Sequence, residues 1–122
     1  MVKLIFCLHR RPDLTEAEFH RYWRDEHGPL VARHAAVLGI RRYAQLHRAP
    51  EALNAVLARS RSAPEAFDGV AELWFDDADA LAEAAATDAG RAAAAELAAD
   101  EQRFIDHSRS PLFVAEEHWV LR

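Results

Sequence analysis

The 122-residue sequence has little of several residues on which common functional sites depend. Its one cysteine, Cys7, excludes an intramolecular disulfide and a zinc site built from cysteines. Its four glycines are not clustered, which excludes a glycine-rich phosphate loop. No apolar run approaches the roughly 20 residues that a membrane-spanning helix needs. The first eight residues contain Lys3 and no small-residue cleavage site, so we expect no signal peptide, no membrane partner and a cytoplasmic protein.

Basic residues are also too few for nucleic acid to be the expected partner. The chain has 15 Lys and Arg against 20 Asp and Glu, a net charge of −5. Residues 1–48 carry 9 basic and 5 acidic side chains, whereas residues 49–122 carry 6 and 15. This uneven division favours contacts between the two halves, within one chain or between two copies.

Apolar residues make up 51% of the sequence, and seven histidines are its unusual chemical resource. The apolar content is enough for one core, so we predict a single domain over residues 1–122. Hydrophobic patterning predicts four strands, at 2–9, 40–48, 70–75 and 112–121. Helices are predicted at 16–26, 30–38, 51–58, 76–86 and 87–105. The order β-α-β-β-α-β is typical of a ferredoxin-like α+β fold, a four-stranded antiparallel sheet with helices on one face.

The first helix carries the clearest local signals. Thr15 and Glu18 have the spacing of a capping box, which predicts where the helix begins. Phe19, Trp23 and His27 follow at intervals of four and therefore share one helix face. The pair Gly28-Pro29 is expected to break the helix, which would leave His27 at a helix C-terminus, where the helix dipole favours a protonated imidazole.

The first strand is apolar on both of its faces. Val2, Leu4, Phe6 and Leu8 alternate with Lys3, Ile5, Cys7 and His9. Helices can cover only one face of the sheet, and no further segment remains to cover the other. We therefore expect a homodimer in which two sheets pack face to face.

Residues 9–30 resemble the opening of the EthD domain, through the spacing Phe-x-x-x-Trp-x-x-x-His after a first strand. Residues 68–75 resemble its third strand, and residues 100–106 resemble its end. The resemblance implies a dimeric α+β barrel that is free of cofactor in most members. The family is named for a protein linked to bacterial degradation of ethyl tert-butyl ether. Similar barrels include polyketide cyclases and a methylmuconolactone isomerase, in which a histidine matching His27 acts in proton transfer.

Three residues are candidates for acid–base chemistry. His27 follows Trp23 by one turn, so its ring can project from the core, and histidine gains or loses a proton near neutral pH. Tyr43 could orient or protonate a substrate oxygen, and Asp106 could hold the His27 ring in one tautomer. Each also has a structural interpretation: a bonded helix end for His27, a packed aromatic for Tyr43 and an ion pair with a nearby arginine for Asp106.

A hydrophobic small-molecule ligand would need apolar walls. We assign Trp23, Trp74 and Phe104 to these walls, and we add His9, at the end of the first strand, to the substrate-binding set. Core packing would explain the three aromatic residues equally well.

Two functions therefore remain open. The first is a cofactor-free isomerase or lyase that carries out isomerisation, cyclisation, dehydration or decarboxylation of a hydrophobic carbonyl or polyketide-like substrate. The second is a non-catalytic binding or accessory protein of a catabolic pathway such as ether degradation. A metal- or haem-dependent oxygenase on the same barrel is a third interpretation. No histidine pair has the spacing of a zinc hydrolase, so we expect no metal. The resemblance to the EthD domain implies that no cofactor is needed.

Overall fold

Four strands form one antiparallel sheet in the order β2-β3-β1-β4 in the computed structural model, which describes residues 1–122. The strands are β1 (Val2–Leu8), β2 (Arg42–His47), β3 (Gly69–Phe75) and β4 (Leu112–Glu116). This arrangement confirms the predicted ferredoxin-like α+β fold. The last strand is shorter than predicted, because Glu116 already pairs with Val2 and β1 has almost no backbone left to pair with later residues.

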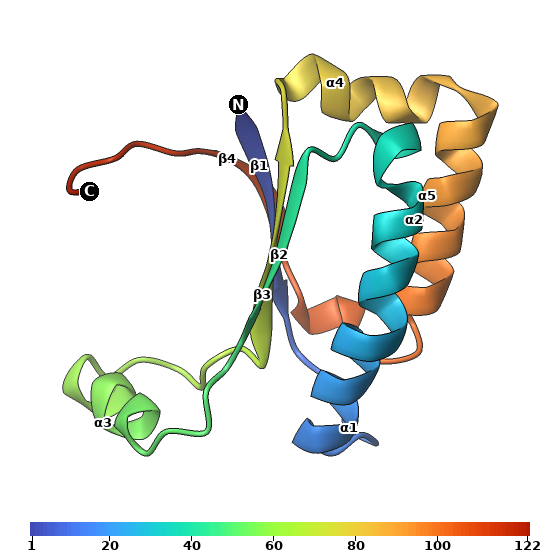
Figure 1. The fold of residues 1–122 in the computed structure, drawn as a ribbon. Helices are drawn as coiled ribbons and strands as arrows, with labels where there is room; N and C mark the ends of the chain where they lie inside the picture. Colours follow the sequence, from blue (N-terminus) through green and yellow to red (C-terminus); the bar gives the residue numbers. More distant parts are fainter.

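Most helices cover one face of this sheet, and the other face is open (Figure 1). The covering helices are α1 (Glu16–Tyr22), α2 (Gly28–Leu38), α4 (Ala78–Glu83) and α5 (Asp88–Glu101). Helix α3 (Leu53–Ser60) and the C-terminal segment both lie on the opposite side of the sheet (Figure 1). No helix combines the length and the apolar character that a bilayer crossing requires.

The predicted helix break at Gly28-Pro29 is wrong. A π-helical stretch (Trp23–His27) joins α1 directly to α2, and the Gly28 N–H donates to the Trp23 carbonyl. Pro29 is accommodated because it directly follows the π-helical stretch, where the regular i→i−4 hydrogen bonds are already interrupted and its missing N–H costs little. His27 therefore lies inside a continuous helix and not at the predicted helix C-terminus. The chain does leave the helix at Gly39, whose φ of 74° is readily adopted by glycine.

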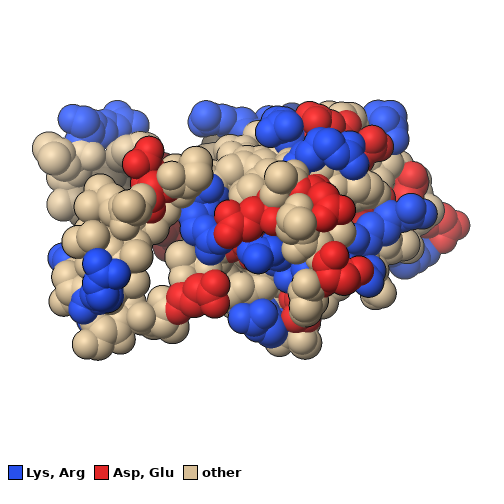
Figure 2. Space-filling model, turned by 90° about the horizontal axis from the view of Figure 1, so that it is seen from below, with Lys and Arg blue, Asp and Glu red and all other residues tan.

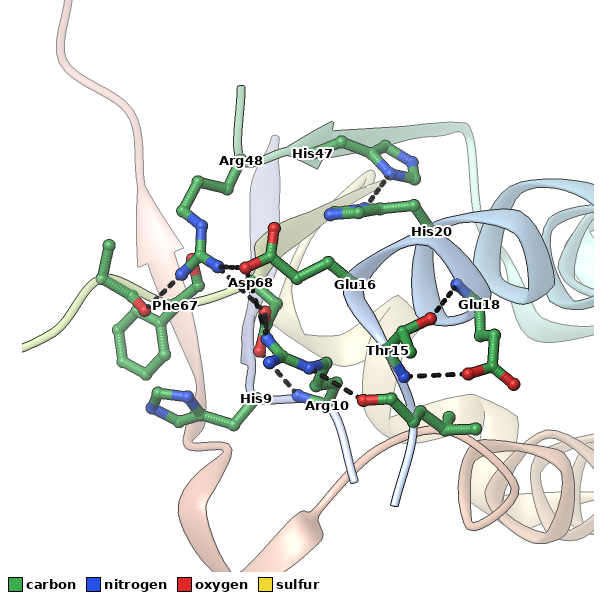
Figure 3. Close-up of polar contacts among 12 residues, drawn as sticks. His9, Arg10, Thr15, Glu16, Glu18, His20, His47, Arg48, Phe67 and Asp68 are labelled. Carbon is green, nitrogen blue, oxygen red and sulfur yellow. Dashed lines mark hydrogen bonds and ion pairs between the residues drawn. The ribbon is translucent and has the colours of Figure 1, made fainter. Parts of the chain in front are cut away.

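The buried acid Asp68 joins the ends of three strands (Figure 3). It is only 3% exposed and accepts hydrogen bonds from the backbone N–H and guanidinium of Arg10, at 2.8 and 2.6 Å. The Arg48 guanidinium approaches the same carboxylate at 3.3 Å and also contacts Glu16 of α1 at 2.9 Å. The predicted capping box at Thr15 is confirmed beside this cluster.

The uneven charge of the two sequence halves is balanced in part by ion pairs within the fold. Arg10 and Arg48 from the first half pair with Asp68 from the second, and Arg41 pairs with Asp76. Seen from below, basic and acidic side chains alternate over the body of the protein, and no patch of one sign forms on this face (Figure 2). The charge distribution therefore gives no support to a polyanionic partner.

Candidate functional site

A cavity of about 400 Å³ lies between the helices and the covered face of the sheet. Hydrophobic residues account for 18 of the 21 that line it, and the other three are His27, Arg91 and Glu101. Its size falls within the range of small-molecule sites, which typically combine apolar walls with a few polar groups.

His27 offers one ring nitrogen to this cavity. Its side chain is nearly buried, and Nδ1 lies 2.7 Å from Oδ2 of Asp100 on α5. Every fully buried side-chain nitrogen or oxygen in the structure has a hydrogen-bond partner. Nε2 of His27 has none, so this atom is not fully buried. Nε2 is therefore accessible from the cavity that His27 lines. The π-helical stretch places this ring against Phe104, at 4.9 Å between ring centroids.

Asp100 is the carboxylate that orients His27. Its second oxygen accepts a hydrogen bond from the Tyr22 hydroxyl at 2.5 Å. Burial and the neighbouring Asp100 raise the pKa of Tyr22 to about 12, so the phenol stays protonated and keeps donating. An acceptor at Nδ1 fixes the proton on that nitrogen and leaves Nε2 with a free lone pair, which is the form that a general base requires.

Tyr43 of β2 reaches the same cavity from the sheet. Its hydroxyl oxygen accepts hydrogen bonds from Trp23 Nε1 at 3.2 Å and from Gln45 Nε2 at 2.8 Å. Burial raises the pKa of Tyr43, so the phenol is protonated at neutral pH. Because both lone pairs of the oxygen are occupied, the O–H is left as a donor.

Of the sequence-predicted site residues, His27, Tyr43 and Trp23 meet at this cavity. Asp106 does not contact His27, which corrects the predicted partner. It accepts hydrogen bonds from the backbone and hydroxyl of Ser108, at 3.2 and 2.6 Å, and so begins a short 3-10 helix.

The other three predicted pocket residues do not line the cavity. Phe104 is fully buried behind the His27 ring. Trp74 and His9 lie on the open face of the sheet, because alternate residues of a strand point to opposite faces. Trp74 packs between the cationic groups of Lys3 and Arg42, and His9 packs on Phe67, at 4.8 Å between ring centroids (Figure 3).

Sequence reasoning missed three polar residues of the site, all on α5. Asp100 follows Ala93 and Leu97 at intervals of four and three, so it continues the buried stripe of that helix, and this spacing could have identified it. Arg91 and Glu101 line the cavity near opposite ends of α5, and no sequence signal distinguishes them from surface charges. No three His, Cys, Asp or Glu side chains are close enough together to bind a metal ion.

Comparison with known proteins identifies the family. The EthD domain model matches residues 11–108. This chain belongs to the EthD domain family. A search of curated proteins finds no match.

Solved structures share the fold of this EthD-domain protein. An ethyl tert-butyl ether D (EthD) family protein from Bacillus halodurans has 24% identity and a TM-score of 0.63, over 97% of this chain and 99% of that one. A dimeric protein of unknown function and ferredoxin-like fold from Bacteroides fragilis has 16% identity and a TM-score of 0.59, over 95% of each chain. An EthD-like protein from Ralstonia eutropha has 18% identity and a TM-score of 0.55, over 94% of this chain and 90% of that one. At these identities the likeness concerns the fold alone, so the chemistry must be argued from the residues.

Proposed function

We propose that this EthD-domain protein binds a small hydrophobic carbonyl compound in the cavity, and that His27 moves a proton at the carbon next to the carbonyl. The observation that carries the proposal is the His27–Asp100 pair, held at 2.7 Å with the opposite ring nitrogen open to an apolar cavity. Such a site needs no bound cofactor for isomerisation, cyclisation, dehydration or decarboxylation through an enolate.

The proton transfer balances with the groups present. The Nε2 lone pair of His27 takes the proton from the carbon, and the electrons of the broken C–H bond move onto the carbonyl oxygen. The Tyr43 O–H donates a hydrogen bond to that oxygen, while Asp100 stabilises the imidazolium that forms. In an isomerisation, His27 then returns the proton to another carbon of the same substrate, and no oxidant or reductant is consumed.

The apolar walls support this chemistry in two ways. They favour a substrate with a hydrophobic body, and they keep water away from the enolate. Trp23 supplies part of the wall and also donates to the Tyr43 oxygen, so it links the shape of the cavity to the position of the donor.

The test uses 1-acetonaphthone, a flat aromatic methyl ketone, in heavy water. We expect the wild-type protein to catalyse exchange of its methyl protons for deuterium, measured by proton NMR. The His27→Gln variant should lose about 100-fold or more of this rate, because the base is removed, while its affinity for the ketone stays within about threefold of wild type.

The matched control is His34→Gln, since His34 lies on α2 and bonds only the exposed Glu96. This variant should exchange at the wild-type rate. If wild type and His27→Gln exchange at equal rates and bind the ketone equally well, His27 is not the general base, and the non-catalytic binding function is favoured.

We also propose that the protein forms a homodimer through the open face of the sheet. Ile5 and Phe113 are directly paired at its centre, and Val70 and Leu46 are paired in the neighbouring row. Phe113 is 52% exposed and Leu46 is 47% exposed, a large apolar area for a free surface. The dimeric Bacteroides fragilis protein of the same fold supports this arrangement. Helix α3 and the C-terminal segment flank the face, where a second copy would contact them (Figure 1).

A further inference from the structure

A row of four side chains connects the cavity with the outside of the protein. Tyr43, Gln45 and His47 are alternate residues of β2 and therefore share its helix-facing side, and His20 of α1 completes the row. The links are Tyr43 Oη to Gln45 Nε2 at 2.8 Å, Gln45 Oε1 to His47 Nε2 at 2.8 Å, and His47 Nδ1 to His20 Nδ1 at 2.6 Å. Figure 3 shows the two histidines facing each other.

The donor and acceptor of every link follow from the Gln45 amide. Its Nε2 donates both to Tyr43 and to the backbone carbonyl of Trp23, at 2.9 Å, so Oε1 must be the acceptor for His47. His47 therefore carries its proton on Nε2 and accepts at Nδ1. His20 must then carry a proton on Nδ1 to donate to it.

The same logic fixes the direction of the Tyr43 hydroxyl. If the Gln45 amide were reversed, its Oε1 would lie against the Trp23 carbonyl oxygen. Oε1 would also accept a hydrogen bond from the Tyr43 O–H, which would then point away from the cavity. The Trp23 carbonyl and the His47 N–H both oppose that reversal. The phenol thus has no competing acceptor within the row.

We propose that Gln45 and His47 are positioning residues that hold Tyr43 as a hydrogen-bond donor toward the cavity, and that the site consequently selects ligands with a compact oxygen acceptor such as a ketone. This inference rests on the proposed function only in requiring that the ligand enter the cavity. The row transmits orientation and carries no proton, because an amide such as Gln45 neither gains nor loses one near neutral pH.

The two histidines are in the neutral state that this row needs at neutral pH. Burial lowers the pKa of both His20 and His47 below the ordinary value of 6.5. The groups around them act in both directions. Asp68 and Glu16 favour a charged His20, whereas the guanidinium groups of Arg48 and Arg24 disfavour it, and Arg24 also faces His47.

Two naphthalene compounds with the same number of non-hydrogen atoms test the inference, 1-acetonaphthone and 1-isopropylnaphthalene, which lacks the oxygen. The measurement is the ratio of their affinities by isothermal titration calorimetry. Tyr43→Phe, which removes the donor, should lower the ketone-to-hydrocarbon ratio by about threefold to tenfold. Gln45→Glu should lower it equally, because a carboxylate accepts the Tyr43 O–H and turns it from the cavity. His34→Gln should leave the ratio unchanged.

Unchanged affinity for 1-isopropylnaphthalene shows that a variant is folded with its cavity intact. A Gln45→Glu variant that binds this hydrocarbon normally and keeps the wild-type ratio would overturn the inference. If wild type binds neither compound, the proposed function fails instead. Nitrogen-15 NMR of the free protein then still tests the hydrogen-bonded row. The row requires the His47 proton on Nε2, and a proton on Nδ1 would refute the proposed orientation of the row.

Discussion

At the scale of single residues, Asp100 decides which nitrogen of His27 faces the cavity. A carboxylate can only accept a hydrogen bond at neutral pH, so it holds the proton on Nδ1. An amide in its place can donate to Nδ1 and so favour the opposite tautomer, in which Nε2 carries the proton and cannot act as a base.

We therefore expect Asp100→Asn to slow deuterium exchange of 1-acetonaphthone by about 100-fold or more, with little change in affinity. Asp106→Asn is the matched control, because Asp106 contacts Ser108 and not His27. It should stay within about threefold of the wild-type rate. A larger effect at Asp106 than at Asp100 would show that the pairing in the structure does not operate in catalysis.

The sequence was informative about some of these residues and silent about others. The spacing of Phe19, Trp23 and His27 is local, so it could be read directly, and it correctly placed His27 on the buried side of its helix. The partner of His27 lies on another helix, 73 positions later, and only tertiary packing brings the two together. The predicted partner Asp106 lies beyond the end of this helix, whereas Asp100 belongs to the buried stripe within it.

At the scale of elements, the continuous helix from α1 to α2 is what carries His27 into the cavity. Sequence rules treat Gly-Pro as a helix end, yet proline is excluded only where its N–H would be needed. The π-helical stretch supplies the wider turn at Trp23–His27, and no local sequence signal marks it. The order of the strands and helices along the chain could be predicted because hydrophobic patterning is local, and the antiparallel sheet was inferred from that order.

The start of β3 sets the position of Trp23, because Gly69 packs directly beneath the indole. A Cβ at Gly69 would lie 2.8 Å from the Leu46 carbonyl oxygen and closer still to Trp23 Cζ3. We expect Gly69→Ala to reduce the free energy of unfolding by about 1–3 kcal/mol, measured by urea denaturation, because either the indole or the strand must move.

The control for this substitution is Gly28→Ala, whose Cβ would lie 3.1 Å from the hydrogen-bonded Nε2 of Gln45 and 3.4 Å from the Trp23 carbonyl oxygen, both farther away than the nearest atoms at Gly69. Alanine also favours a helix over glycine by about 1 kcal/mol. This variant should therefore be destabilised less than Gly69→Ala. If Gly69→Ala is as stable as wild type, the close packing of Trp23 on β3 is not a constraint on the site.

At the scale of the whole molecule, the sheet divides the protein into two functional sides. The helix-covered side holds the cavity with His27 and Tyr43, and the open side carries the exposed apolar residues Leu46 of β2 and Phe113 of β4. The pattern of the first strand already indicated that both faces need cover. The position of α3 on the open side could not be predicted, because none of its residues is buried against the rest of the chain.

Phe113 and Val114 test the role of the open face, because these neighbours in β4 are similarly exposed, at 52% and 49%, but point to opposite faces of the sheet. We expect the wild-type protein to sediment at twice its chain mass. Phe113→Asp should sediment as a folded monomer, because the dimer would bury an unpaired carboxylate against Ile5. Val114→Asp should remain a dimer, since its side chain lies on the helix-facing side at the sheet edge. If both variants dissociate, the contact extends around β4, and if neither does, two copies do not pair through this face.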